Sequence, residues 1–307
     1  MQKKYNFIKE ENQLIKTIKN AYYMLPVLSK IDEILKEDNS IHYQDAFNSL
    51  HDIIQGSKHE VLELINKRKK SGLIKDINQA SKSVVGNIFP YSLMYIFLKN
   101  KEIQNIEQHI YITNRKTTVK GFDKISTIKL ADGETQKPDC DLIIYSYPKN
   151  STGATSSKIT TNKDKNTDCP KCIILSLKTS LRERAAQTYK WKLLLEIANE
   201  HSSKIKEKYG IVYEAPEVPL ICFVTVNFYN EINNPQQRGM LKFFDRSFLA
   251  KKVNKEIKKD LKIINEEETI EEEKTTEIRK QKPKEFISPL SELVNLVNEF
   301  FQLDNKE

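Results

Sequence analysis

The pattern of apolar and polar residues changes near residue 105. Up to residue 100, apolar residues recur at helical spacing, as in "LIKTIKNAYYML", where Leu14, Ile15 and Ile18 share one face. Beyond it, short runs rich in Ile, Val and Tyr predict strands. These runs cover residues 109–113, 124–130, 141–146, 172–178 and 220–229. Helices followed by strands and further helices indicate an α/β (α+β) fold class.

Two of the predicted strands, "DLIIYS" and "CIILSLK", are almost continuously apolar. Such runs are typical of central strands that are covered on both faces. We therefore expect a central mixed β-sheet flanked by helices. Three regions are predicted: a helical region over 1–100 for dimerisation or DNA clamping, a core over 101–250, and a charged linker with an amphipathic helix over 251–307.

The charge balance favours a polyanionic partner. The 307 residues include 50 Lys and Arg against 42 Asp and Glu, which gives a net charge of +8. The first residues lack the apolar core of a signal peptide, and "NIFPYSLMYIFLKN" is too short to span a bilayer, so we expect a cytoplasmic protein without a membrane partner. No glycine-rich phosphate loop is present, so no nucleotide cofactor is expected.

Two carboxylates and a lysine lie on neighbouring predicted strands. "KPDCDLIIYS" places Asp139 and Asp141 two residues apart at a strand entrance, and "IILSLK" places Ser176 and Lys178 two residues apart on the next strand. Residues two apart share one face of a strand, so pairing of these strands brings the acids and the lysine together. Carboxylates bind Mg²⁺, and a lysine orients a water or stabilises a pentavalent phosphate. This set is suited to phosphodiester hydrolysis.

A dense group of charges follows the lysine. Arg182, Glu183 and Arg184 begin a predicted helix, where two arginines oppose the positive end of the helix dipole. A locally unfavourable choice of this kind often marks a ligand site, and arginine reads guanine edges in DNA. Gln187 and Lys190 on the same helix are further candidates for DNA contacts. The plain alternatives are a charged helix start and a strand-end lysine that reaches solvent.

The order "PD…SLK" resembles the PD-(D/E)xK nuclease motif, and "SLKTSLRERAAQTYKW" resembles type II restriction endonucleases, most closely the BsaWI-like group that cuts sites containing CCGG. The resemblance covers residues 75–250. It implies a PD-(D/E)xK core, a prokaryotic, Mg²⁺-dependent, sequence-specific endonuclease acting on double-stranded DNA, and products with 5′-phosphate ends. A palindromic site further implies a homodimer. "LRER" is similar to the element with which the group reads guanine.

The second acid of that motif is replaced by Ser176. The CCGG-cutting group also carries a serine there and recruits a glutamate from the following helix, at positions that are Trp191 and Lys192 here. Glu196, about one turn later, is the nearest replacement, and Glu183 and Asp141 are the other options. The expected catalytic residues are Asp139, Ser176, Lys178 and Glu196. The expected metal ligands are Asp139, Asp141 and Glu196.

Other readings stay open at this point. One is a repair or recombination nuclease of the same fold that cuts by DNA structure, a second is a non-catalytic DNA-binding protein, and a third is a helical interaction protein. The polar stretch 147–168 is expected to follow the DNA backbone through its lysines, Lys149, Lys158, Lys163 and Lys165. "CPKC" offers Cys169 and Cys172 as half of a zinc site, which Cys140 and Cys222 complete only if their strands lie alongside.

Overall fold

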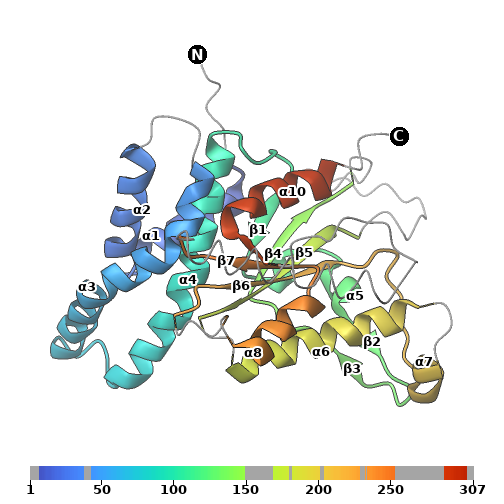
Figure 1. Ribbon diagram of the computed structural model, residues 1–307. Coiled ribbons are helices and arrows are strands. Elements are labelled where there is room, and N and C mark those ends of the chain that lie inside the picture. Colours follow the sequence, from blue (N-terminus) through green and yellow to red (C-terminus); the bar gives the residue numbers. More distant parts are fainter. Residues whose placement is uncertain are drawn as a thin grey trace.

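The computed structural model describes residues 7–37, 43–148, 169–179, 182–200, 204–228, 232, 234–252 and 287–302. Side chains 182–185 lie outside the described part, as do the four lysines of the stretch 147–168 and most of the charged segment after residue 250. In Figure 1 the N-terminal helices stand at one side of a twisted sheet, and the later helices lie above and below it.

The N-terminal region is helical, as predicted. It contains α1 (Lys9–Asn20), α2 (Leu25–Glu37), the 3₁₀ helix η1 (Tyr43–Ser49), α3 (Leu50–Lys70) and α4 (Ile77–Glu102). Asp76 caps α4 by accepting hydrogen bonds from the backbone N–H groups of Asn78 and Gln79. The helix continues through Pro90, whose missing N–H removes one internal hydrogen bond. None of the described helices is long and apolar enough to cross a membrane.

The central sheet has six strands in the order β1-β4-β5-β6-β7-β8. The strands are β1 (Tyr111–Thr113), β4 (Leu142–Ser146), β5 (Lys171–Lys178), β6 (Leu220–Thr225), β7 (Arg246–Leu249) and β8 (Ile287–Pro289). β4 runs antiparallel to both β1 and β5, whereas β5 to β8 are parallel. The predicted mixed sheet with flanking helices is therefore confirmed. The start of β4 lies at the same sheet edge as the carboxyl ends of β5 and β6.

The predicted strand over 124–130 is wrong for most of its length. Residues Phe122–Ser126 form the short helix α5, which follows Gly121 in a left-handed conformation with φ of 83°. Phe122 and Ile125 are three residues apart, and both are buried, so helical spacing serves this stretch better than alternation. Only β2 (Ile128–Lys129) is extended, and it pairs with β3 (Thr135–Gln136) in a separate hairpin.

Each face of the sheet has its own hydrophobic cluster. On one face, Ile144, Leu175 and Val224 pack with apolar residues of α1 to α4 and of α10 (Leu293–Gln302). On the other face, Ile143 and Ile174 pack with α5, the 3₁₀ helix η4 (Met240–Phe243) and α6 (Arg182–Asn199). The short helices α7 (Lys204–Tyr209) and α8 (Pro235–Gly239) complete this side, with the 3₁₀ turns η2 (Lys116–Thr118) and η5 (Leu290–Glu292) elsewhere. The predicted boundaries at residues 100 and 250 stay a prediction.

Candidate active site

The antiparallel pairing of β4 with β5 brings the two predicted carboxylates to the end of β5. Leu142 lies opposite Leu175 and is the first residue of β4 in the pairing with β5, so Asp141 directly precedes the paired residues. The Asp141 N–H donates to the Leu175 carbonyl at 3.1 Å, and the Asp141 carboxylate accepts from the Leu177 N–H at 2.8 Å. Asp141 thus continues the ladder and is fixed by two backbone groups of β5.

Lys178 binds both carboxylates. Its Nζ lies 2.6 Å from Asp139 Oδ2 and 2.9 Å from Asp141 Oδ2. The lysine side chain is only 9% exposed, whereas the side chains of Asp139 and Asp141 are 43% and 30% exposed. The ammonium is therefore buried beneath the two carboxylates. The carboxylates keep one side exposed to solvent, from which a ligand can approach them.

Two opposing effects act on the pKa of Lys178. Burial is the largest and lowers the pKa, because the charged form loses hydration. The hydrogen bond to Asp139 and the charge of Asp141 raise it, and together they outweigh burial, so the net pKa lies above its ordinary value. Lys178 is therefore an ammonium at neutral pH, a donor and a positive charge rather than a base.

Ser176 lies two residues before Lys178, on the same face of β5. It is fully buried, and its hydroxyl oxygen lies 3.1 Å from that of Thr188 on α6. The hydroxyl pair joins the strand to the helix that covers it. No sequence pattern singles out Thr188, because its contact depends on how α6 lies across the sheet.

Glu196 does not join Asp139, Asp141 and Lys178, which we call the carboxylate–lysine cluster. Its carboxylate lies 3.3 Å from Lys192 Nζ, which in turn lies 2.8 Å from Asp245 Oδ1. Asp245 also accepts from the backbone N–H of Ile221, which is level with Ile174 in the sheet. α6 therefore runs back along β5, away from Lys178, and Glu196 lies about 12 Å along the helix beyond Thr188. This position does not support the prediction that Glu196 shares a metal with Asp139.

The predicted DNA contacts come from the first half of α6. Gln187 and Lys190 are exposed, whereas Trp191 is 6% exposed and packs in the core. Tyr189 stacks on Phe243 of η4 with ring centroids 5.0 Å apart. Arg182, Glu183 and Arg184 form the first turn of α6, and their side chains lie outside the described part.

Asp139 and Asp141 have the chemistry to hold a divalent ion. Both carboxylates approach one cationic atom, the Lys178 ammonium, so their oxygens already converge. Mg²⁺ is commonly held by one or two carboxylates, with waters and substrate phosphates as its other ligands. Among the described residues, no three His, Cys, Asp or Glu side chains form a metal-binding group. This finding also gives no support to the alternative of a zinc site at Cys169 and Cys172.

Three residues near the cluster were not singled out from the sequence. Lys116 Nζ lies 3.4 Å from the Pro138 carbonyl, beside Asp139. Asn227 follows β6 with a left-handed φ of 49° and is buried. Phe228 donates its N–H to the Thr179 carbonyl at 3.4 Å, directly after Lys178. The turns after β1 and β6 bring these residues close to Lys178 and Asp139. No regular spacing in the sequence predicts the course of such turns.

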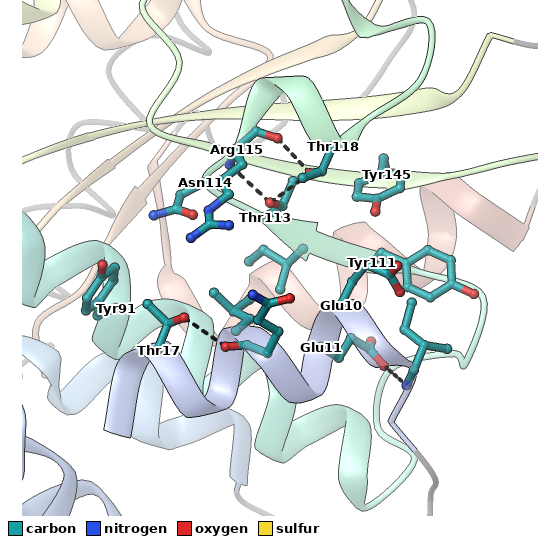
Figure 2. Close-up of a pocket in the computed structure, with 14 residues that line it drawn as sticks. Glu10, Glu11, Thr17, Tyr91, Tyr111, Thr113, Asn114, Arg115, Thr118 and Tyr145 are labelled. Atoms are coloured by element: carbon teal, nitrogen blue, oxygen red, sulfur yellow. Dashed lines mark hydrogen bonds between the residues drawn. The ribbon is translucent and has the colours of Figure 1, made fainter. Parts of the chain in front are cut away.

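A separate pocket lies at the end of β1, with a volume of about 140 Å³. Figure 2 shows Asn114 and Arg115 on one side of it and Thr17 and Tyr91 on the other. None of the residues of the carboxylate–lysine cluster lines it. The pocket and the cluster are therefore different sites.

A family model described as BsaWI restriction endonuclease type 2 matches residues 103–272, which is more than half of the chain. The matched segment contains β1 to β7, the carboxylate–lysine cluster and the whole of α6. A search of curated proteins found no match.

Proposed function

Because the chain belongs to the BsaWI family of type 2 restriction endonucleases, we propose that the cluster of Asp139, Asp141 and Lys178 hydrolyses DNA with the help of Mg²⁺. Membership makes the protein a site-specific deoxyribonuclease, a hydrolase that acts on double-stranded DNA. The observation that carries the assignment of the site is the convergence of both carboxylates on one ammonium at the carboxyl edge of the sheet. In open α/β sheets this edge is where ligands commonly bind.

In the proposed mechanism, Asp139 and Asp141 hold the metal ion and Lys178 faces the scissile phosphate. A bound Mg²⁺ supplies Lewis acidity and a more acidic water. Lys178, as an ammonium, donates a hydrogen bond to the attacking water or to a phosphate oxygen and stabilises the negative charge of the transition state. Attack of water on phosphorus with departure of the 3′ oxygen leaves a 5′-phosphate and a 3′-hydroxyl. The buried Ser176–Thr188 pair is a positioning contact that sets α6 against β5.

Sequence recognition is assigned to α6. Its first turn carries Arg182, Glu183 and Arg184, and the helix starts at the edge that holds Lys178. Arg side chains bind guanine O6 and N7 in the major groove, and each bidentate contact discriminates by roughly 1–3 kcal/mol. The exposed Gln187 and Lys190 extend this surface. We infer a CCGG-containing site, and a homodimer whose two active sites cut the two strands of a palindrome. We further propose that the protein acts in the cytoplasm of a prokaryote.

Digestion of a fully sequenced phage DNA tests the proposal. Wild-type protein with Mg²⁺ should give discrete bands, whose ends report the cleaved sequence. Ca²⁺ in place of Mg²⁺, or the substitution Lys178→Ala, should leave the DNA intact, with a loss of roughly 10²–10⁴-fold in rate for the variant. A smear with Mg²⁺ would instead indicate cutting without sequence preference. Intact DNA in all lanes, with no gel shift in Ca²⁺, would exclude the proposed function.

A further inference from the structure

The hairpin of α3 and α4 forms an arm whose base lies at the catalytic edge of the sheet. The His51 N–H, in the first turn of α3, donates to the Ala250 carbonyl at 2.9 Å. The His51 ring lies 5.3 Å from that of Phe228, and Phe228 is hydrogen-bonded to Thr179. Thr179 directly follows Lys178, so the start of α3 is linked to the active site through two contacts.

The far end of the arm is strongly basic. Residues 66–82 contain six basic side chains and one acidic side chain, which gives this segment a net charge of +5. We call the six residues the basic tip: Lys67, Arg68, Lys69, Lys70, Lys75 and Lys82. All are exposed except Arg68, which is half-buried over the Tyr22 ring. Within the described part of the chain, no ion pair involves any of them.

Helix stability explains only part of this cluster. Basic residues in the last turn of a helix interact favourably with its dipole, which accounts for Lys67 to Lys70. Lys75 directly precedes Asp76, the N-cap of α4, where a positive charge is unfavourable, and Lys82 lies in the second turn of α4, where the helix dipole does not favour a positive charge. The acid among them, Asp76, is already used as the cap of α4. Neither capping nor the helix dipole accounts for the remaining positive charge of the basic tip, which suits a polyanionic ligand.

The arm has the reach and direction to meet DNA that is bound at the active site. α3 has 21 residues and is about 30 Å long, close to one helical turn of B-DNA at 34–36 Å. In Figure 1, the joined ends of α3 and α4 project beyond the sheet on the side where α6 begins. With 3.4 Å between phosphates on each strand, the arm reaches roughly nine base pairs from its base.

We propose that the basic tip binds backbone phosphates of the duplex that flanks the cleaved sequence. This inference rests on the proposed function, because it places the same DNA molecule on the active site and on the arm. The contact adds affinity without sequence preference, since phosphates are alike at every step. It predicts that the enzyme recognises a longer piece of duplex than the sequence it cuts.

The test compares the triple variant K67Q/K70Q/K75Q with the wild type and with the control K204Q/K206Q/K208Q. The control removes three exposed or half-exposed lysines of α7, at the opposite end of α6. Binding is measured in Ca²⁺ over a range of salt concentrations. The probes are duplexes that carry the sequence cleaved in phage DNA, with flanks of about five or about fifteen base pairs on each side.

For the wild type and the control, we expect the long duplex to bind more tightly, with a steeper salt dependence. For the tip variant, the slope of log K against log[salt] on the long duplex should fall by roughly 2–3, about 0.9 for each lost contact. Binding to the short duplex should be unchanged. Equal slopes for all three proteins would overturn the proposal while leaving the nuclease function intact, as would a tip variant altered only in oligomeric state. A wild type that neither cuts nor binds DNA would overturn both.

Discussion

At the scale of single residues, Asp139 and Asp141 differ in the contacts that they make and in their exposure. Asp141 accepts the Leu177 N–H at 2.8 Å and also binds Lys178, so it is part of the sheet as well as of the site. Asp139 binds only Lys178 among its described contacts, and its side chain is more exposed. Asp141 therefore contributes to the structure of the sheet, whereas the described contacts of Asp139 are confined to Lys178.

This difference predicts unequal costs of substitution. Asp141→Ala should lower the free energy of unfolding by about 1–3 kcal/mol, because the Leu177 N–H loses its acceptor and the Lys178 ammonium loses one of its two. Asp141→Asn keeps an oxygen acceptor and should cost less. Asp139→Ala should cost less than about 1 kcal/mol, as expected for a half-exposed ion pair. Urea unfolding in a chelating buffer measures all three, and an Asp139→Ala cost equal to that of Asp141→Ala would contradict the assignment.

At the scale of secondary structure, α6 joins two separate places on the sheet. In its first half, Thr188 contacts Ser176, which lies two residues before Lys178 on β5. One turn later, Lys192 is 7% exposed on its side chain and binds Asp245, which precedes β7. The helix is thus fixed at both points, and its direction carries each later residue farther from Lys178.

This direction predicts that Glu196 is dispensable for catalysis. Glu196→Gln should cut phage DNA at a rate within a few-fold of the wild type, because its carboxylate pairs with Lys192 rather than facing Lys178. Asp139→Asn, as the matched control, should lose roughly 10²–10⁴-fold. Band patterns and initial rates on the same DNA compare the two. A folded Glu196→Gln protein without activity would restore Glu196 as a catalytic residue.

The spacing of residues along strands was enough to predict which side chains converge. Asp141 and Lys178 lie on neighbouring apolar runs, and their pairing follows once both runs are strands of one sheet. The placement of Glu196 does not follow from spacing alone, because it depends on the path of α6 across the sheet, and its role in catalysis stays a prediction. Likewise, "KISTIKL" alternates well enough for a strand, yet the helix α5 buries Phe122 and Ile125 together. Tertiary packing decided both cases.

At the scale of the whole molecule, the segment that matches the family model does not form a complete hydrophobic core by itself. One face of its sheet is covered by α4, whose Leu93, Met94 and Phe97 are fully buried, and by α10. Both helices lie outside residues 103–272. The flanking regions are therefore part of the hydrophobic core of the enzyme.

We predict that a chain ending at residue 286 does not fold. It lacks β8 and the four buried apolar residues of α10, Leu293, Val294, Val297 and Phe301. At about 1.5–3 kcal/mol for each residue, their burial contributes roughly 6–12 kcal/mol, close to the whole stability of a typical domain. A chain ending at residue 302 is the control and should fold. Circular dichroism with thermal unfolding compares them, and a cooperative transition in the shorter chain would disprove the prediction.

The position of Lys178 between its two carboxylates has a consequence for the proposed binding of a divalent ion. The ammonium contacts one oxygen, Oδ2, of each carboxylate, so an ion could be held by the second oxygen of each on the solvent-facing side. On the proposed function, an ion bound there would withdraw negative charge from the two carboxylates and weaken their hold on the ammonium. Lys178 would then be freer to turn its N–H groups toward the DNA. The same contacts would thus link the occupancy of the ion site to the availability of the lysine.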